Sequence, residues 1–234
     1  MKKALIKDDA GRPLTGERYC MNTDLVSYYK DRAKEYERIY SKPERQEELL
    51  LAAKLLQDIF SSKRVFEIAC GTGYWTEIIS KTANSILATD INETVIELAK
   101  SKTYYPAKVN FQTVNIFDLH TLDRYESLFG GFIWSHIKLQ DLNRFISIIN
   151  SQVERGGTVG FIDNSYVEGS NLPVTETDEF GNTYQTRTLE NGTVHKVIKN
   201  FPSESFITQL LMDKVSDFNF VNLQYYWILT YKVN

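Results

Sequence analysis

The chain has 234 residues, a net charge of -3, and 42% hydrophobic and 24% charged residues. Its length suits one domain with a substantial core, and its slight negative charge argues against broad binding to nucleic acid. Two cysteines, Cys20 and Cys70, lack the spacing of metal ligands, so we expect a reducing compartment with neither a disulfide framework nor a metal site.

Residues 1–60 are expected to form an irregular arm and two helices. Residues 1–22 show little periodicity and lack the apolar core of a signal peptide. From Thr23 to Tyr40 large side chains recur at three- and four-residue steps, which indicates a helix. Ser41-Lys42-Pro43-Glu44 has the sequence of a capping box ahead of a second, strongly apolar helix over 49–60. Because no apolar run reaches membrane-spanning length, we expect a cytoplasmic protein that makes no membrane contact.

Residues 61–163 alternate between expected strands and helices. The strands lie near 65–69, 85–90, 109–114, 128–133 and 158–163. Three helices are expected between these strands. The first runs from the loop after the first strand to about Thr82, and the second begins at an Asn92 cap. The third runs from Leu142 to Val153, and Gly156-Gly157 ends it. This alternation predicts an α/β protein with a doubly wound, mainly parallel sheet.

Beyond residue 163 the pattern changes. Residues 183–190 and 193–198 are rich in β-formers and are joined by Asn191-Gly192, a strong hairpin signal. A two-residue turn there places His195 opposite Thr188 and Lys196 opposite Arg187. We expect residues 164–202 to form a hairpin insertion that folds over or beside the ligand crevice as a lid or substrate wall.

Residues 203–234 are expected to complete the same single domain. A helix over 203–213 is followed by a nearly continuous run of β-formers over 220–233. No clear turn divides that run, so the pairing of the closing strands stays open.

One motif in the first βα unit carries most of the functional information. The run from Val65 to Trp75 has an apolar start, an acid, a tight Gly-x-Gly turn and a stretch that can form a helix. Gly71 and Gly73 allow a sharp turn and close approach to a ligand, while the helix offers free N–H groups. Asp90 follows Gly73 by seventeen residues and ends the second strand, where it can accept hydrogen bonds from ribose hydroxyls. Together these residues predict a cofactor that contains adenosine.

The motif resembles the first motif of class I S-adenosylmethionine-dependent methyltransferases. Glu67 precedes Gly71 by four residues, and Thr76 stands where a dinucleotide fingerprint has its third glycine. The family often has glycine where this chain has Ala69. Segments 163–170, 181–185 and 199–202 look similar to a bacterial subgroup of the family, so the resemblance covers most of the chain after Tyr28. It implies a Rossmann-like sheet of seven strands with an antiparallel end, and a helical cap over the cofactor edge.

The resemblance also implies S-adenosylmethionine as cofactor and a set of residues that bind it. In that family the acid at the end of the first strand orders the loop, and the residues after the third strand contact adenine. Asn115 would do so here, or Asp118 in its place, unless Asn115 only turns the chain. The expected cofactor-binding residues are Glu67, Ala69, Cys70, Gly71, Thr72, Gly73, Asp90, Ile91, Asn115, Ile116, Phe117 and Gly130.

A histidine and several polar residues are candidates for catalysis and acceptor binding. His136 lies just beyond the fourth strand and could remove a substrate proton, or simply cap or pack beside the next helix. The candidate acceptor contacts are Tyr28, Asn164, Tyr166, Arg187 and His195. An anion could separate Arg187 from Lys196 across the expected hairpin, although solvent between two long side chains is the commoner solution.

These features favour methyl transfer to an oxygen or nitrogen nucleophile of a small molecule by in-line displacement, in a monomer or homodimer. The fourth strand lacks the Asn/Asp-Pro-Pro-Tyr/Phe motif of amino-directed nucleic-acid methyltransferases, which makes nucleic acid an unlikely partner. Two other functions stay open: a cofactor-binding protein without catalysis, and an NAD(P)-dependent oxidoreductase. The missing third glycine and the absence of an evident Tyr-x-x-x-Lys pair disfavour the oxidoreductase. Protein, lipid and RNA acceptors also stay open.

Overall fold

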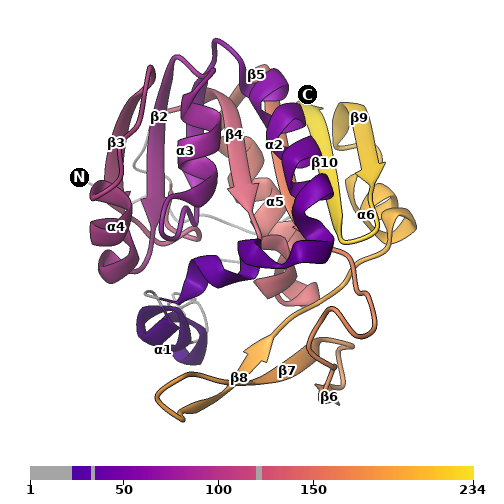
Figure 1. Ribbon diagram of the computed structural model, residues 1–234. Helices are drawn as coiled ribbons and strands as arrows, with labels where there is room; N and C mark the ends of the chain where they lie inside the picture. Colours follow the sequence, from indigo (N-terminus) through magenta and orange to yellow (C-terminus); the bar gives the residue numbers. More distant parts are fainter. Residues whose placement is uncertain (1–22, 33–34, 120–122) are drawn as a thin grey trace, which may run out of the picture.

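The computed structural model describes residues 23–32, 35–119 and 123–234, and its centre is a seven-stranded sheet (Figure 1). The strand order is β3-β2-β1-β4-β5-β10-β9, and neighbours from β3 to β5 are parallel. These strands are β1 (Arg64–Ile68), β2 (Ser85–Asp90), β3 (Lys108–Thr113), β4 (Tyr125–Gly131), β5 (Val153–Asn164), β9 (Val215–Asn222) and β10 (Tyr226–Val233). The predicted doubly wound fold with seven strands is confirmed.

Helices cover both faces of the sheet because its strands are apolar on both sides. Adjacent residues of a strand point to opposite layers: Val65 packs with α2 (Gln46–Phe60) and α3 (Tyr74–Ser80). Phe66 packs with α5 (Leu142–Ser151) and α6 (Glu204–Leu211) on the other face. The helix α4 (Glu93–Lys100) contacts β2 and β3, and the Asn92 side chain caps it by accepting from the Thr94 N–H at 3.0 Å, as predicted.

The segment before α2 differs from the predicted capping box. Residues Tyr36–Ser41 and Pro43–Arg45 form two short 3-10 helices, and Lys42 between them makes no side-chain cap. Gln46 at the start of α2 instead ties the helix to this segment, because its side-chain amide donates to the carbonyls of Tyr40 and Lys42, both at 2.8 Å.

The glycine pair Gly156-Gly157 does not end a helix, as the sequence suggested. The helix α5 stops at Ser151, and both glycines lie inside β5, where the register against β4 shifts between Tyr125 and Ser127. Gly156 has a φ of 78°, and a Cβ on Gly157 would lie 2.7 Å from the carbonyl oxygen of Glu126. The pair therefore serves a β-bulge that requires small residues.

The closing strands form the antiparallel pair that the sequence left open. β10 runs antiparallel to both β5 and β9, and the short connection Leu223–Tyr225 separates β9 from β10. β9 begins at Val215, earlier than the run of β-formers had indicated.

A small three-stranded sheet interrupts the chain between β5 and α6. Its strands are β6 (Glu176–Thr177), β7 (Thr183–Thr188) and β8 (Val194–Ile198), in the order β6-β7-β8. In Figure 1 the arrowheads of β2 and β4 point toward this insertion sheet and toward α1 (Thr23–Arg32). The side chains of Tyr28, Leu189 and Val197 form a buried cluster that joins α1 to the insertion sheet.

The register of the β7–β8 hairpin is shifted by one residue from the prediction. Arg187 pairs with His195, and Thr186 pairs with Lys196. The cause is a three-residue loop in place of a two-residue turn: Gly192 donates to the Leu189 carbonyl at 2.9 Å and adopts a φ of 84°. The expected contact between Arg187 and Lys196 is therefore wrong. Within the described ranges, no helix is both long and apolar enough to cross a membrane.

Candidate functional site

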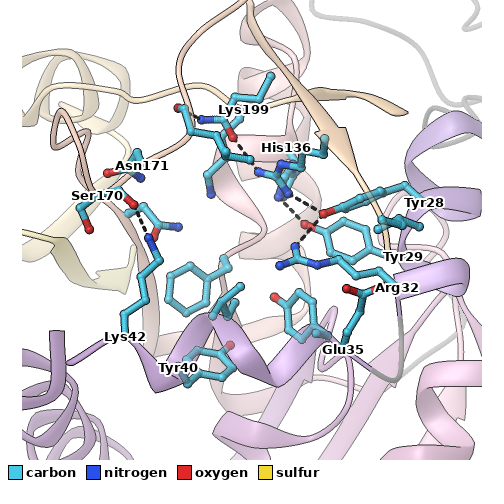
Figure 2. Close-up of a pocket in the computed structure, with 18 of the residues that line it drawn as sticks. Tyr28, Tyr29, Arg32, Glu35, Tyr40, Lys42, His136, Ser170, Asn171 and Lys199 are labelled. Carbon is cyan, nitrogen blue, oxygen red and sulfur yellow. Dashed lines mark hydrogen bonds between the residues drawn. The ribbon is translucent and has the colours of Figure 1, made fainter. Parts of the chain in front are cut away.

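Two adjoining cavities open at the carboxyl edge of the sheet. The first, the loop cavity, lies beside the glycine loop after β1 and is lined there by Ala69, Gly71 and Thr72. The second, the cap cavity, has a volume of about 250 Å³ and lies among α1, the 3-10 helix Tyr36–Ser41 and the insertion sheet (Figure 2). Four side chains line both cavities: Tyr29, Tyr36, Phe132 and His136.

The glycine loop has the left-handed backbone that its sequence requires. Gly71 and Gly73 have φ values of 55° and 80°, and Ala69 reaches 50° although it carries a Cβ. A Cβ on Gly73 would overlap the hydroxyl of Tyr104, so only glycine fits there. The loop is tied to the cap, because the Thr72 hydroxyl donates to Glu37 at 2.7 Å.

Asp90 joins the loop to the start of α4. One carboxylate oxygen accepts from the Gly71 N–H at 3.0 Å and the other from the Asn92 N–H at 2.9 Å. Burial raises the pKa of Asp90 to about 6, although both hydrogen bonds favour the charged form. Asp90 also lines the loop cavity, together with Ile91 and Ile116.

Glu67 lies in the interior and does not line either cavity. Its carboxyl is buried, and its Oε2 atom has no hydrogen-bond partner among the described residues. Burial, with the nearby Asp90 charge, raises the pKa of Glu67 to about 8, so the carboxyl is mostly protonated at neutral pH. Burial likewise raises the pKa of the Cys70 thiol, which therefore stays neutral.

Three of the expected cofactor contacts point elsewhere. The Asn115 side chain accepts from the Phe117 N–H at 3.0 Å, so it turns the chain, and the Arg144 guanidinium covers the Phe117 ring at 5.6 Å. A Cβ on Gly130 would lie 2.7 Å from the Phe161 ring, which shows that this glycine makes room for core packing. Its neighbour Gly131 lines the loop cavity instead.

His136 sits in the shared wall as a neutral base. Its Nδ1 atom lies 2.6 Å from the carbonyl oxygen of Ile198, which can only accept, so Nδ1 carries the proton. Its Nε2 atom then accepts from the Tyr29 hydroxyl at 2.7 Å. Burial, with the positive charges of Lys199 and Arg187, holds the pKa of His136 well below its ordinary range. Burial also raises the pKa of the Tyr29 phenol, which keeps its proton.

A buried ion pair fastens the insertion to the sheet behind His136. The Lys199 ammonium donates to Asp163 at 2.8 Å and to the Ser135 hydroxyl at 2.6 Å. The second Asp163 oxygen accepts from the Ser135 N–H at 2.9 Å. Burial works against the Asp163 charge, but Lys199 and these hydrogen bonds hold the pKa of Asp163 below its ordinary value. The network fixes the end of β8 against the ends of β4 and β5.

The predicted acceptor contacts divide into two groups. Tyr28, Asn164 and Arg187 line the cap cavity. Tyr166 is 44% exposed and packs on the Phe201 ring at 5.1 Å, outside both cavities. His195 packs edge-on against the far side of Tyr28, at 5.3 Å between ring centres, and does not line the cap cavity.

Several residues that line the site were not among those predicted from the sequence. They share a place in the cap cavity wall: Tyr29, Arg32, Tyr36, Arg45 and Lys199. The crowding of tyrosines in the cap segment and the run from Lys199 to Pro202 were the only signals for them in the sequence.

The fold and the sequence of the core agree with known methyltransferases. Residues 65–157 match the family model of a methyltransferase domain. The structure is similar to that of DhpI in complex with SAH, with a TM-score of 0.71 at 22% identity over 92% of this chain and 97% of that one. It is also similar to magnesium protoporphyrin IX methyltransferase from Synechocystis with bound SAM, with a TM-score of 0.62 at 14% identity over 94% and 100% of the two chains. A comparison with curated protein sequences finds no match. The resemblance to class I methyltransferases is thus confirmed.

Proposed function

We propose that this chain, which carries a methyltransferase domain over residues 65–157, uses S-adenosylmethionine to methylate an oxygen or nitrogen nucleophile of a small molecule. The observation that carries the proposal is the pair of cavities that meet at one wall. A transfer enzyme needs donor and acceptor side by side, shielded from water and correctly oriented. The loop cavity is suited to the donor and the cap cavity to the acceptor.

The loop cavity has the groups that an adenosyl ligand needs. The Asp90 carboxylate lies where ribose hydroxyls would donate to it, and Ile91 and Ile116 supply apolar surface for a base. Gly71 keeps the backbone open to the ligand, since a Cβ there would reach only the Tyr36 ring at 3.9 Å. When bound, S-adenosylmethionine supplies a methyl group activated by its positive sulfur. We assign Glu67 and Cys70 to the support of this loop.

His136 is the candidate general base for an acceptor that arrives protonated. Its Nε2 lone pair is available at neutral pH because the imidazole stays neutral. Tyr29 occupies that lone pair, so an acceptor proton reaches His136 either after Tyr29 turns away or through the Tyr29 hydroxyl, which donates one proton and accepts another. Tyr29 and Phe132 line both cavities and restrict the space between donor and acceptor.

Binding of S-adenosylhomocysteine, compared with NADH and NADPH, tests the proposal. A ligand at about a hundred times its dissociation constant stabilises a protein by roughly 2.7 kcal/mol, so a clear rise in melting temperature is expected with S-adenosylhomocysteine alone. A flat response to S-adenosylhomocysteine beside a clear shift with NADH would end the methyltransferase proposal.

A further inference from the structure

We propose that the methyl acceptor is an acidic small molecule, and that Arg187 and Arg32 bind its carboxylate, phosphate or phosphonate group in the cap cavity. The inference rests on the proposed function for its reaction, but its argument comes from the charges of the cavity wall.

The wall of the cap cavity is strongly positive in a chain whose net charge is negative. Five cations line it, against the single carboxylate of Glu35; they are Arg32, Lys42, Arg45, Arg187 and Lys199. Lys199 is neutralised by Asp163. Arg45 is satisfied by uncharged oxygens, among them the Ser170 hydroxyl at 2.8 Å and the Asn164 amide at 3.2 Å. Lys199 thus has a counter-ion, and Arg45 has several hydrogen-bond acceptors of its own.

Arg187 and Arg32 are held together by one neutral oxygen. The Tyr28 hydroxyl accepts from Arg32 at 2.7 Å and from Arg187 at 3.2 Å. Within the described part of the chain neither guanidinium forms an ion pair. Two like charges converging on one phenol repel each other, and both guanidinium groups are half-buried, where a charge without a counter-ion is less well solvated than at the surface. The Tyr28 ring, 5.4 Å from the Arg187 guanidinium carbon, offsets only part of that cost.

Arg187 also keeps an unused donor. The residue is half-buried, and its Nη2 atom donates to Gln185 at 2.9 Å, while its buried Nε atom has no hydrogen-bond partner among the described residues. A carboxylate, phosphate or phosphonate group in the cavity would neutralise the excess charge, because a guanidinium presents its N–H groups in the geometry that such anions accept.

The position of the two arginines fits an acceptor rather than a remote effector. Both line the cavity that shares its wall with the loop cavity, and the positive charge of Arg187 helps to lower the pKa of His136 in that wall. An anion bound at Arg187 therefore holds the rest of the molecule close to the candidate base. Figure 2 shows Arg32, Tyr28 and Tyr29 on one side of this cavity and Lys42 on the other.

The test measures anion binding to the full-length protein saturated with S-adenosylhomocysteine. The probes are inorganic phosphate, phenylphosphonate and benzoate, with benzamide as the neutral counterpart of benzoate. The variants are R187Q and R32Q. The matched control is R155Q, at an exposed arginine near the start of β5, the end of that strand away from the cap cavity. We expect wild type and R155Q to bind at least one anion and to ignore benzamide, whereas R187Q and R32Q bind about tenfold to a hundredfold more weakly.

Each outcome decides one of the two proposals. Three results would overturn the proposal of an acidic acceptor. They are binding of benzamide as well as benzoate, no binding of any anion, and unchanged anion affinity in both R187Q and R32Q. Comparison of phenylphosphonate with benzoate distinguishes a phosphorus acid from a carboxylate. S-adenosylhomocysteine affinity is measured first for every variant, and its retention shows that the variant is folded. If wild type fails to bind S-adenosylhomocysteine but binds anions through Arg187, the proposed function fails and the anion site stands.

Discussion

Asp90 connects the glycine loop with α4 through its two carboxylate oxygens, which accept from Gly71 and Asn92. The sequence predicts that this acid lies at the ligand edge of the sheet and accepts hydrogen bonds from ribose hydroxyls. The structure adds that the same carboxylate also organises the backbone around the cavity. We therefore expect removal of this carboxylate to weaken cofactor binding both directly and through the shape of the loop.

We expect D90A to bind S-adenosylhomocysteine about tenfold to a hundredfold more weakly, because charge-assisted hydrogen bonds contribute roughly 1.5–3 kcal/mol each. D90N keeps one acceptor oxygen and should lose less. Calorimetric titration of both variants checks the order. Equal affinity in D90A and wild type would remove Asp90 from the cofactor site.

Glu67 makes the stability of the ligand-free protein depend on pH. Its folded pKa is about 8 against an ordinary 4.5, so between these values the folded state holds a proton that the unfolded state has lost. The free energy of unfolding then falls as pH rises, by at most about 1.4 kcal/mol per pH unit. His136 has the opposite sign, because its lowered pKa costs stability only as pH falls below about 6.5.

The window from pH 6.5 to 8 therefore isolates Glu67. Wild type should lose roughly 1.5–2 kcal/mol of unfolding free energy across it, whereas E67Q, which cannot ionise, should stay flat. Urea unfolding at the two pH values measures the difference. E154Q, at an exposed site, serves as the control and should follow wild type. The same slope in E67Q and wild type would contradict the assignment.

At the level of elements, α1 depends on the insertion sheet for its position. Tyr28 of α1 packs with Leu189 and Val197, and the next residue, Tyr29, lines both cavities. Through α1 the insertion thus contributes to the shape of the loop cavity as well as the cap cavity. The role of the insertion as a substrate wall stays a prediction. Its contacts with α1 indicate a second role, which is to hold that helix in position.

Substitutions on one strand separate these roles. Val197 is 1% exposed and Val194 is 60% exposed, both on β8. V197D places an unpaired charge in the cluster and should cost roughly 2–4 kcal/mol in unfolding free energy, with weaker binding of S-adenosylhomocysteine. V194D should change stability by less than about 0.5 kcal/mol. Undiminished cofactor affinity in V197D would show that the loop cavity forms without a docked α1.

Local chemistry determines which elements the sequence could predict. The inner strands β1 and β5 contain apolar runs because both of their faces are buried, and the Asn92 cap needs only its own neighbours. The β7–β8 register was mispredicted because Asn191-Gly192 suits two loop lengths, and Gly192 adopts its left-handed φ in the longer one. Gly156-Gly157 was mispredicted because a bulge depends on the strand beside it.

At the scale of the whole molecule, the glycine-loop side of the loop cavity was predictable from one motif, whereas only Tyr28, Asn164 and Arg187 of the cap cavity were predicted. Ala69, Gly71, Thr72, Asp90 and Ile91 come from two neighbouring βα units, so a short motif contains them. The cap cavity is assembled from side chains far apart in the chain, and no local pattern records that they meet. Its positive character appears only once the fold brings those charges together.

The contact between α1 and the insertion sheet also sets a time for assembly during synthesis. Tyr28 and Arg187 are 159 residues apart. At roughly 5–20 residues per second, about 8 to 32 s pass between the translation of these two positions. Until the insertion sheet has been translated, the Tyr28 side chain of α1 therefore lacks Leu189 and Val197, the partners that bury it in the folded protein. The cap cavity can be completed only when most of the polypeptide has been made.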